Sequence, residues 1–490
     1  MMDTDNRYPR FGSSDPQNPA NFSRIRKIHI VAAGTLFTFN SALGSSLPSG
    51  AQSKIGSAFK VSSDMQLVLL NSLYLIGFAI GPLIWGPLSE YSGRRPVLIG
   101  TYTGYTTFTL GCALAPSYRS LLVFRFLCGA NAAAPNAVLG GLYSDIYESP
   151  EKRGIAMGFF MSMTTLGPQI APIISGFVSV VSWRWAFWVA LIIAGLGMPP
   201  MLLLPETYAP VLMQKQKRGY RQSQCGLDTN EGVEKKKSIK WTFAAVFTRP
   251  FVMIVQEPIL LFTSLYLALV YAVLYLFFQA YPIVFQGLYG MSAGVSGLAF
   301  LPMMAGSIIA FSAFLWYTSF HSKAMSQNKP WAGQEEYRRL PLAGGGAPAV
   351  VIGLFWLAWT SYETIHPVVP MLSGIWFGAG YLLIFLAMIN YLTDAYKQNS
   401  ASAQAAASTV RSVAAVCLPL ATDPMYGNLG IHWATSLLGF LALGMAAIPF
   451  VFIRYGVWIR EHSRFCKKRK RPHDMHRSRK PQTKSNLIGP

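Results

Sequence analysis

Residues 66–95 of the 490-residue chain read QLVLLNSLYLIGFAIGPLIWGPLSEYSGRR, an apolar run followed by a short charged loop. Residues 66–88 contain no charged side chain. A helix needs about 20 predominantly apolar residues to cross the hydrocarbon core of a bilayer. The segment therefore predicts a transmembrane helix, which ends at the loop that carries Glu90, Arg94 and Arg95.

The composition of the whole chain indicates a membrane protein. Hydrophobic residues make up 52% of the sequence and charged residues only 12%, whereas soluble globular domains contain about 25% charged residues. A soluble chain of this composition would have too little polar surface to cover its exterior. A bilayer removes that requirement, because the protein surface that faces lipid is itself apolar.

Eleven further segments are candidate spans, so the sequence predicts an all-α integral membrane protein with twelve transmembrane helices. Glycine and proline inside the spans are tolerated, since neighbouring helices satisfy the backbone groups that they free. The twelve predicted spans are 28–48, 66–88, 97–115, 121–143, 154–180, 185–204, 254–281, 296–316, 343–361, 368–392, 402–421 and 430–453.

Basic residues are distributed unequally between the two sides of the membrane. If the N-terminus is cytosolic, 35 of the 41 basic residues fall on the cytosolic side. The positive-inside rule then predicts that both termini are cytosolic. We expect a multi-pass protein of the plasma membrane, with the vacuolar membrane as the alternative. The other six basic residues are Lys54, Lys60, Arg119 and Arg184 on the outer side and Arg125 and Arg411 within spans.

The polar segments divide the chain into two six-helix halves. We expect a cytosolic arm at 1–27, halves at 28–204 and 254–453, a cytosolic linker at 205–253 and a basic tail at 454–490. The tail contains the run KKRKR at 467–471, which next to a span predicts contact with anionic lipid and not with nucleic acid. Two such halves form a carrier architecture in which substrate binds near the midplane.

Several other classes of site and of protein are not expected. The five cysteines are odd in number and lack ligand spacing, which argues against a disulfide framework and a metal site. The first 27 residues are polar and do not form a signal peptide. The seven histidines are scattered, with no nucleophile–base spacing, so we expect neither an enzyme nor a cofactor.

The loop after the second span reads GPLSEYSGRRP over residues 86–96. It resembles the signature G-x-x-x-D-R-x-G-R-R of the major facilitator superfamily, with Glu90 in place of Asp and Tyr91 in place of Arg. The alternative is a short basic loop that only sets orientation. The resemblance implies a conformational latch formed by Gly86, Glu90, Gly93, Arg94, Arg95 and Asp145.

Two contacts are expected of this latch. Glu90 should meet the start of the eleventh span near Ser402, where free N–H groups favour an anion. Arg94 or Arg95 should pair with Asp145 at the cytosolic end of the fourth span.

The fourth and fifth spans carry two more elements of the superfamily. Arg125-Phe-Leu-Cys-Gly129 resembles R-x-x-x-G, and an arginine here should face a polar cavity or a partner or, alternatively, reach the outer headgroups. The sequence GPQIAPIISG at 167–176 resembles the antiporter element G-x-x-x-G-P-x-x-G-G. It implies a helix-packing hinge at Gly167, Pro168, Pro172 and Gly176, with a plain packing seam as the alternative.

Stretches outside these elements point to one branch of the superfamily. PETYAP at 205–210, LYLFFQAYPIVF at 274–285 and NYLTDAY at 390–396 resemble the fungal drug:proton antiporters with twelve spans. The resemblance runs from about Asn18 to Phe465. It implies a substrate and proton pathway that includes Asn40, Arg125, Glu257, Gln279, Asn390 and Arg411.

The expected function is export of a small organic compound by proton antiport. Gln279 stands where relatives often have a glutamate, which disfavours polyamine export. The aromatic residues of the seventh span suit apolar ligands, or else face lipid or pack. Proton-coupled import of a nutrient or vitamin and a non-transporting sensor are the alternatives. Expected partners are the substrate, protons and lipid, and the protein is expected to be a monomer without bound metal.

Overall fold

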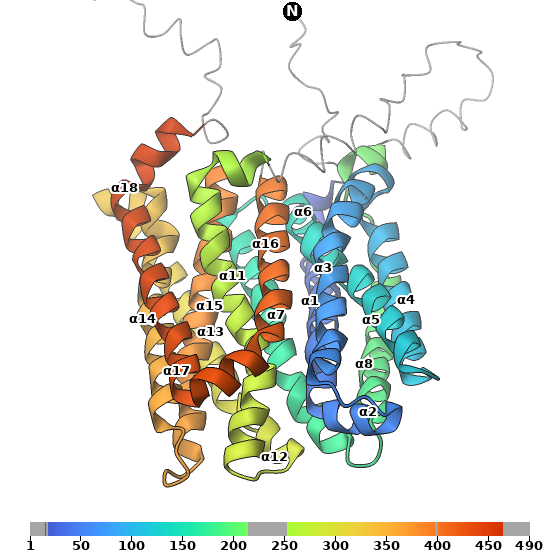
Figure 1. Cartoon of the computed structure of the whole chain (residues 1–490). Coiled ribbons are helices and arrows are strands. Elements are labelled where there is room, and N and C mark those ends of the chain that lie inside the picture. The colour runs from blue at the N-terminus through green and yellow to red at the C-terminus, as the bar shows by residue number, and fades with distance from the viewer. Residues whose placement is uncertain (1–14, 16–17, 214–251, 397–399, 464–490) are drawn as a thin grey trace, which may run out of the picture.

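The computed structural model describes residue 15 and residues 18–213, 252–396 and 400–463. Most of the predicted arm, linker and tail, including the run at 467–471, lies outside these residues. All regular elements within the described part are helices. Figure 1 shows these helices side by side in one bundle, with α1 to α8 on one side and most of α11 to α18 on the other.

The first half contains six crossings. The fourth crossing is formed by two helices that meet at Ala133, because Pro135 in the first turn of the second helix has no N–H to continue the ladder. The helices are α1 (Arg24–Ser46), α2 (Gln52–Phe59), α3 (Asp64–Ser92), α4 (Arg94–Ala113), α5 (Tyr118–Ala132), α6 (Ala134–Ile146), α7 (Pro150–Val178) and α8 (Arg184–Leu202).

The second half also contains six crossings. A π-helical turn, Pro282–Leu288, follows the first of them. The helices are α11 (Pro258–Tyr281), α12 (Ala293–Gly297), α13 (Phe300–Ser326), α14 (Glu335–Thr360), α15 (Val368–Tyr396), α16 (Ser400–Leu420), α17 (Thr422–Met445) and α18 (Ala447–His462).

The twelve-helix fold class predicted from the sequence is confirmed. Ten helical segments of the described residues are long and apolar enough to cross a membrane. The predicted spans 97–115 and 154–180 correspond to α4 and α7, which pack among the others: α4 contacts α5 and α8, and α7 contacts α1 and α13.

Helix limits differ from the predicted spans at several places, and α13 and α14 extend into the loop that we expected at 317–342. Helix α1 begins at Arg24 and α18 ends at His462, so both extend beyond the apolar core into segments that we expected to be arm and tail. Helix α17 bends at Gly430, which has φ 72° and ψ 169°. Residues with a side chain avoid this conformation, so the glycine sets the corner before the last crossing.

The two ends of the bundle are distinct. We call the end where α1 begins and α18 ends the terminal face, and the other end the opposite face. The short helices α2 and α12 lie at the opposite face in Figure 1. The halves meet through α3 with α16 and through α7 with α12, α13 and α15.

Candidate functional site

A buried arginine fastens the loop between α3 and α4 at the terminal face. Arg94 is 7% exposed, and its Nε lies 3.6 Å from Asp145 Oδ2 at the end of α6. Its Nη1 donates a 2.7 Å hydrogen bond to Ser89 Oγ, and its guanidinium lies 4.9 Å from the ring centroid of Tyr208. The pairing of Arg94 with Asp145 expected from the sequence is therefore present, and these contacts lie within the first half.

Glu206, which follows α8, binds the start of α4. Its Oε1 accepts hydrogen bonds from the N–H groups of Arg94 (2.9 Å), Thr207 (3.0 Å) and Tyr208 (2.9 Å), and its Oε2 accepts one from Arg95 N–H (3.2 Å). The first N–H groups of a helix have no partner inside it, and a negative charge there is favourable. Glu206 therefore caps α4 across more than one hundred residues of sequence.

Gly93 makes this cap possible. It has φ 105°, and a Cβ built on it would lie 2.4 Å from Glu206 Oε2. Both the backbone conformation and the close carboxylate require glycine. Gly86 differs, because a Cβ there would meet nothing closer than Ala137 Cβ at 3.8 Å. No close helix approach therefore requires a glycine at position 86 in this structure.

Glu90 does not make the contact expected of it in this structure. Its side chain is exposed, and within the described residues no hydrogen bond or ion pair joins it to α16 near Ser402. Arg95 is also exposed and donates from Nη2 to the carbonyl of Leu202 at 3.3 Å.

The second half repeats this arrangement at the same face. Arg339 Nε at the start of α14 lies 3.3 Å from Asp394 Oδ2 near the end of α15, in the way that Arg94 at the start of α4 meets Asp145. Glu336 forms an ion pair with Arg460 of α18. We did not predict this set from the sequence. Its signal is the run EEYRR at 335–339, which follows the second crossing of the second half. The Glu90–Arg95 loop follows the second crossing of the first half in the same way.

Arg125 is held by backbone oxygens inside the first half. It is 2% exposed, and its Nε, Nη1 and Nη2 donate to the carbonyls of Leu70 (2.8 Å), Gly44 (2.6 Å) and Ser45 (2.9 Å). Its guanidinium lies 4.5 Å from the ring centroid of Tyr74. Arg125 thus joins α5 to α1 and α3, and it does not reach toward the headgroups.

The fifth-span element packs closely at both ends. A Cβ on Gly167 would lie 2.8 Å from Leu43 N of α1, and one on Gly176 would lie 2.8 Å from the carbonyl oxygen of Ala293 in α12. Pro172 has no N–H, so the carbonyl of Pro168 is left free by α7. It accepts a 2.8 Å hydrogen bond from Ser46 Oγ instead. The two prolines therefore help to fasten α7 to α1.

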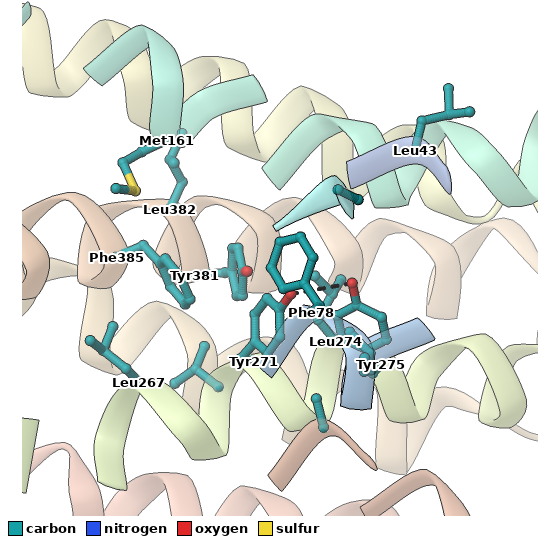
Figure 2. Close-up of a cluster of buried hydrophobic side chains, with 14 of the residues drawn as sticks. Leu43, Phe78, Met161, Leu267, Tyr271, Leu274, Tyr275, Tyr381, Leu382 and Phe385 are labelled. Carbon is teal, nitrogen blue, oxygen red and sulfur yellow. Dashed lines mark hydrogen bonds between the residues drawn. The ribbon is translucent and has the colours of Figure 1, made fainter. Parts of the chain in front are cut away.

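Buried aromatic side chains fill the centre between the halves. Tyr271 donates to Tyr275 (3.3 Å) within α11, and the hydroxyls of Tyr275 and Ser45 of α1 lie 2.7 Å apart, which links the halves. Figure 2 shows Tyr381 and Phe385 of α15 in the same cluster, and Phe78 of α3 beside the two tyrosines of α11. The aromatic residues of the seventh span from Tyr266 to Tyr281 therefore pack inside the bundle and do not face lipid, whereas Phe262 is 47% exposed.

Arg411 of α16 reaches this aromatic cluster. It is 6% exposed, and its guanidinium lies 5.0 Å from the ring centroid of Tyr271 and 5.1 Å from that of Phe385. In a second link between the halves, Gln169 of α7 donates to Ser307 of α13 at 3.3 Å.

The remaining predicted pathway residues do not join Arg411. Asn40 is buried and its Nδ2 lies 3.5 Å from the Tyr102 hydroxyl of α4, whereas Asn390 donates to the Leu386 carbonyl of its own helix. Glu257 is 1% exposed at the start of α11, where it accepts hydrogen bonds from the hydroxyls of Tyr396 and Ser463. Gln279 is half-buried.

No metal site is found among the described residues, because no group of three or more His, Cys, Asp or Glu side chains in them could hold an ion. The described helices form two halves around a buried aromatic centre, an arrangement typical of membrane transporters.

Comparison with known proteins agrees with this class. The sequence profile of the Major Facilitator Superfamily matches residues 31–419. An MFS-type efflux pump of Trichophyton rubrum is 39% identical over 462 residues, which cover 92% of this chain and 76% of that protein. A major facilitator superfamily multidrug transporter of Aspergillus fumigatus is 36% identical over 462 residues, covering 93% and 75%. An efflux pump of Fusarium oxysporum is 36% identical over 454 residues, covering 92% and 76%.

The fold is also shared with a solved structure. The proton:xylose symporter XylE aligns with a TM-score of 0.63 at 16% sequence identity, over 88% of this chain and 97% of that one. The chain belongs to the major facilitator superfamily. The resemblance to its fungal efflux-type members that the sequence indicated is confirmed.

Proposed function

We propose that this protein exports small organic compounds from the cytosol, driven by proton antiport. The observation that carries the proposal is the similarity, over more than nine-tenths of the chain, to fungal transporters named efflux pumps and multidrug transporters. The buried aromatic centre is consistent with apolar or aromatic substrates, because such rings offer large contact areas to them.

A proton gradient is the energy source that we infer. The chain contains no G-x-x-x-x-G-K-[ST] loop, so it lacks the phosphate-binding element typical of ATP-driven pumps. An elementary charge that crosses the membrane potential contributes about 2.3 kcal/mol per 100 mV. Such a gradient is sufficient for substantial outward transport.

Expression in a drug-sensitive yeast tests the direction of transport. Cells that express the protein should accumulate less of at least one amphipathic or aromatic compound than cells with the empty vector. A protonophore should abolish the difference, because it collapses the gradient. Higher accumulation on expression, lost on addition of the protonophore, would instead show an importer.

We propose that the terminal face is cytosolic and that the membrane is the plasma membrane. The orientation is supported by the distribution of basic residues. Cys225 and Cys466 lie in segments that the sequence assigns to the cytosol, outside the described residues. An impermeant thiol reagent should therefore label single-cysteine variants that retain either residue only after the cells are permeabilised. Labelling of intact cells would reverse the orientation.

We propose that the contacts at the terminal face are the part of the expected conformational latch that holds each half together. Arg94 with Asp145 and Arg339 with Asp394 fix the first helix turns of α4 and α14 in the two halves. Rigid halves can rock as bodies about a central site, so these ion pairs are expected to stabilise each half during transport. We further propose that a monomer is the functional unit.

A further inference from the structure

Two arginines lie buried within the predicted spans, and they differ in how their charges are compensated. They are Arg125 and Arg411, and none of the 20 acidic residues falls in the middle of a span. Arg125 donates to three backbone carbonyls. A charge inside the membrane is unfavourable unless it is paired or solvated, and for Arg125 the carbonyl dipoles supply that compensation.

Arg411 lacks such compensation. Among the described residues its polar contact is a 3.3 Å hydrogen bond from Nη2 to Ser408 Oγ on its own helix. Its Nε is buried without a hydrogen-bond partner in the described part of the chain, and no carboxylate there pairs with it. The cation is nevertheless fixed in place, because it packs against the rings of Tyr271 and Phe385, whose centroids are 5.9 Å apart.

Two hydroxyl groups belong to neighbours of Arg411, one in the fold and one in the chain. The ring of Tyr381 stacks on Phe385 with centroids 4.6 Å apart, and both side chains are visible in the cluster of Figure 2. The Ser412 hydroxyl, next to Arg411 in the chain, is buried and has no hydrogen-bond partner among the described residues, whereas the Tyr381 hydroxyl interacts with the side chain of Thr165 of α7. The centre thus combines aromatic walls, one cation without a counter-charge among the described residues, and hydroxyl groups.

We propose that the exported substrate is an amphipathic organic anion whose acidic group pairs with Arg411 while its apolar body packs against Tyr271 and Phe385. A guanidinium offers a planar fork of donors that matches a carboxylate. An anion would supply the missing counter-charge, whereas an organic cation would be repelled. The inside-negative potential of a cell also favours outward movement of an anion. This inference rests on the proposed export function.

Three probes that differ mainly in charge test this assignment on the full-length protein in lipid nanodiscs. They are 1-naphthoate, the neutral 1-naphthamide and the cationic 1-naphthylmethylammonium, and their dissociation constants are measured by calorimetry. We expect 1-naphthoate to bind at least about tenfold more tightly than the other two, as is typical when a charged hydrogen bond is gained. Arg411→Gln should remove that advantage and change 1-naphthamide binding by less than about threefold.

Binding of 1-naphthamide serves as an internal control for folding. Arg119→Gln is the control variant, because it removes an exposed arginine at the start of α5, and it should leave the dissociation constants of all three probes unchanged. Equal binding of 1-naphthoate and 1-naphthamide, absence of 1-naphthoate binding, or an unchanged preference in Arg411→Gln would each overturn the anion assignment. Export of only neutral or cationic compounds in the yeast assay would overturn it while leaving the export proposal intact. Absence of any efflux there would count against the export proposal itself.

Discussion

Arg125→Lys is expected to remove most transport and to lower the melting temperature of the purified protein. The guanidinium joins α5 to carbonyls of α1 and α3 through three separate nitrogens. A single ammonium cannot reproduce that planar geometry. Each hydrogen bond to a charged group contributes about 1.5–3 kcal/mol, so loss of two of them destabilises the first half by several times the thermal energy.

Arg119→Lys is the matched control, because Arg119 is exposed near the start of the same helix. Its melting temperature and its transport should equal those of the wild-type protein. Normal transport and stability of Arg125→Lys would show that the three carbonyl contacts contribute to neither property in the membrane. An arginine that reaches the outer headgroups would then be the better interpretation.

Glu206→Ala is expected to reduce transport more than any change at Glu90. The Glu206 carboxylate accepts four backbone N–H hydrogen bonds, two of them from the first turn of α4. Loss of a helix cap costs about 0.5–2 kcal/mol, and here the same group also fixes the loop that bears Arg94. Initial rates of efflux, normalised to the amount of protein in the membrane, measure the effect.

Glu90→Gln is the comparison, because Glu90 is an exposed carboxylate of the same region. We expect it to transport at close to the wild-type rate. Gly93→Ala should resemble Glu206→Ala, since its Cβ would displace the carboxylate. A larger loss of transport in Glu90→Gln than in Glu206→Ala would contradict this ranking. It would indicate that Glu90 forms the latch contact in another conformation, as the sequence motif suggested.

The crossings could be predicted because nearly all of them depend on a long apolar run within one segment, with α4 and α7 the less apolar exceptions. The surface helices α2 and α12 and the corner at Gly430 could not, since they are short and lie at the ends of spans. Helix limits at Arg24 and His462 were missed for a related reason. Basic and polar residues continue a helix beyond the hydrocarbon, where hydropathy no longer marks it.

Within the site, the sequence identified individual residues better than their partners. The pair Arg94–Asp145 was expected from a motif, whereas the Glu206 cap was not, although PETYAP had been singled out. Glu206 and Arg94 are 112 positions apart in the sequence, and no pattern within a short segment indicates a contact between them. The difference between the satisfied Arg125 and the uncompensated Arg411 also arises only when α1, α3, α11 and α15 are brought together.

Proton-driven exchange is tested most directly in vesicles that contain the purified protein. The vesicle interior is made more acidic than the exterior, the electrical potential is clamped at zero, and an exported compound identified in yeast is added outside. Through an antiporter, protons leave the acidic interior and the compound enters in exchange, so the compound should accumulate inside. A weak acid that crosses the bilayer passively would instead accumulate on the less acidic, outer side. Protein-free vesicles should not. Absence of accumulation, or accumulation only when the exterior is the more acidic side, would contradict proton antiport.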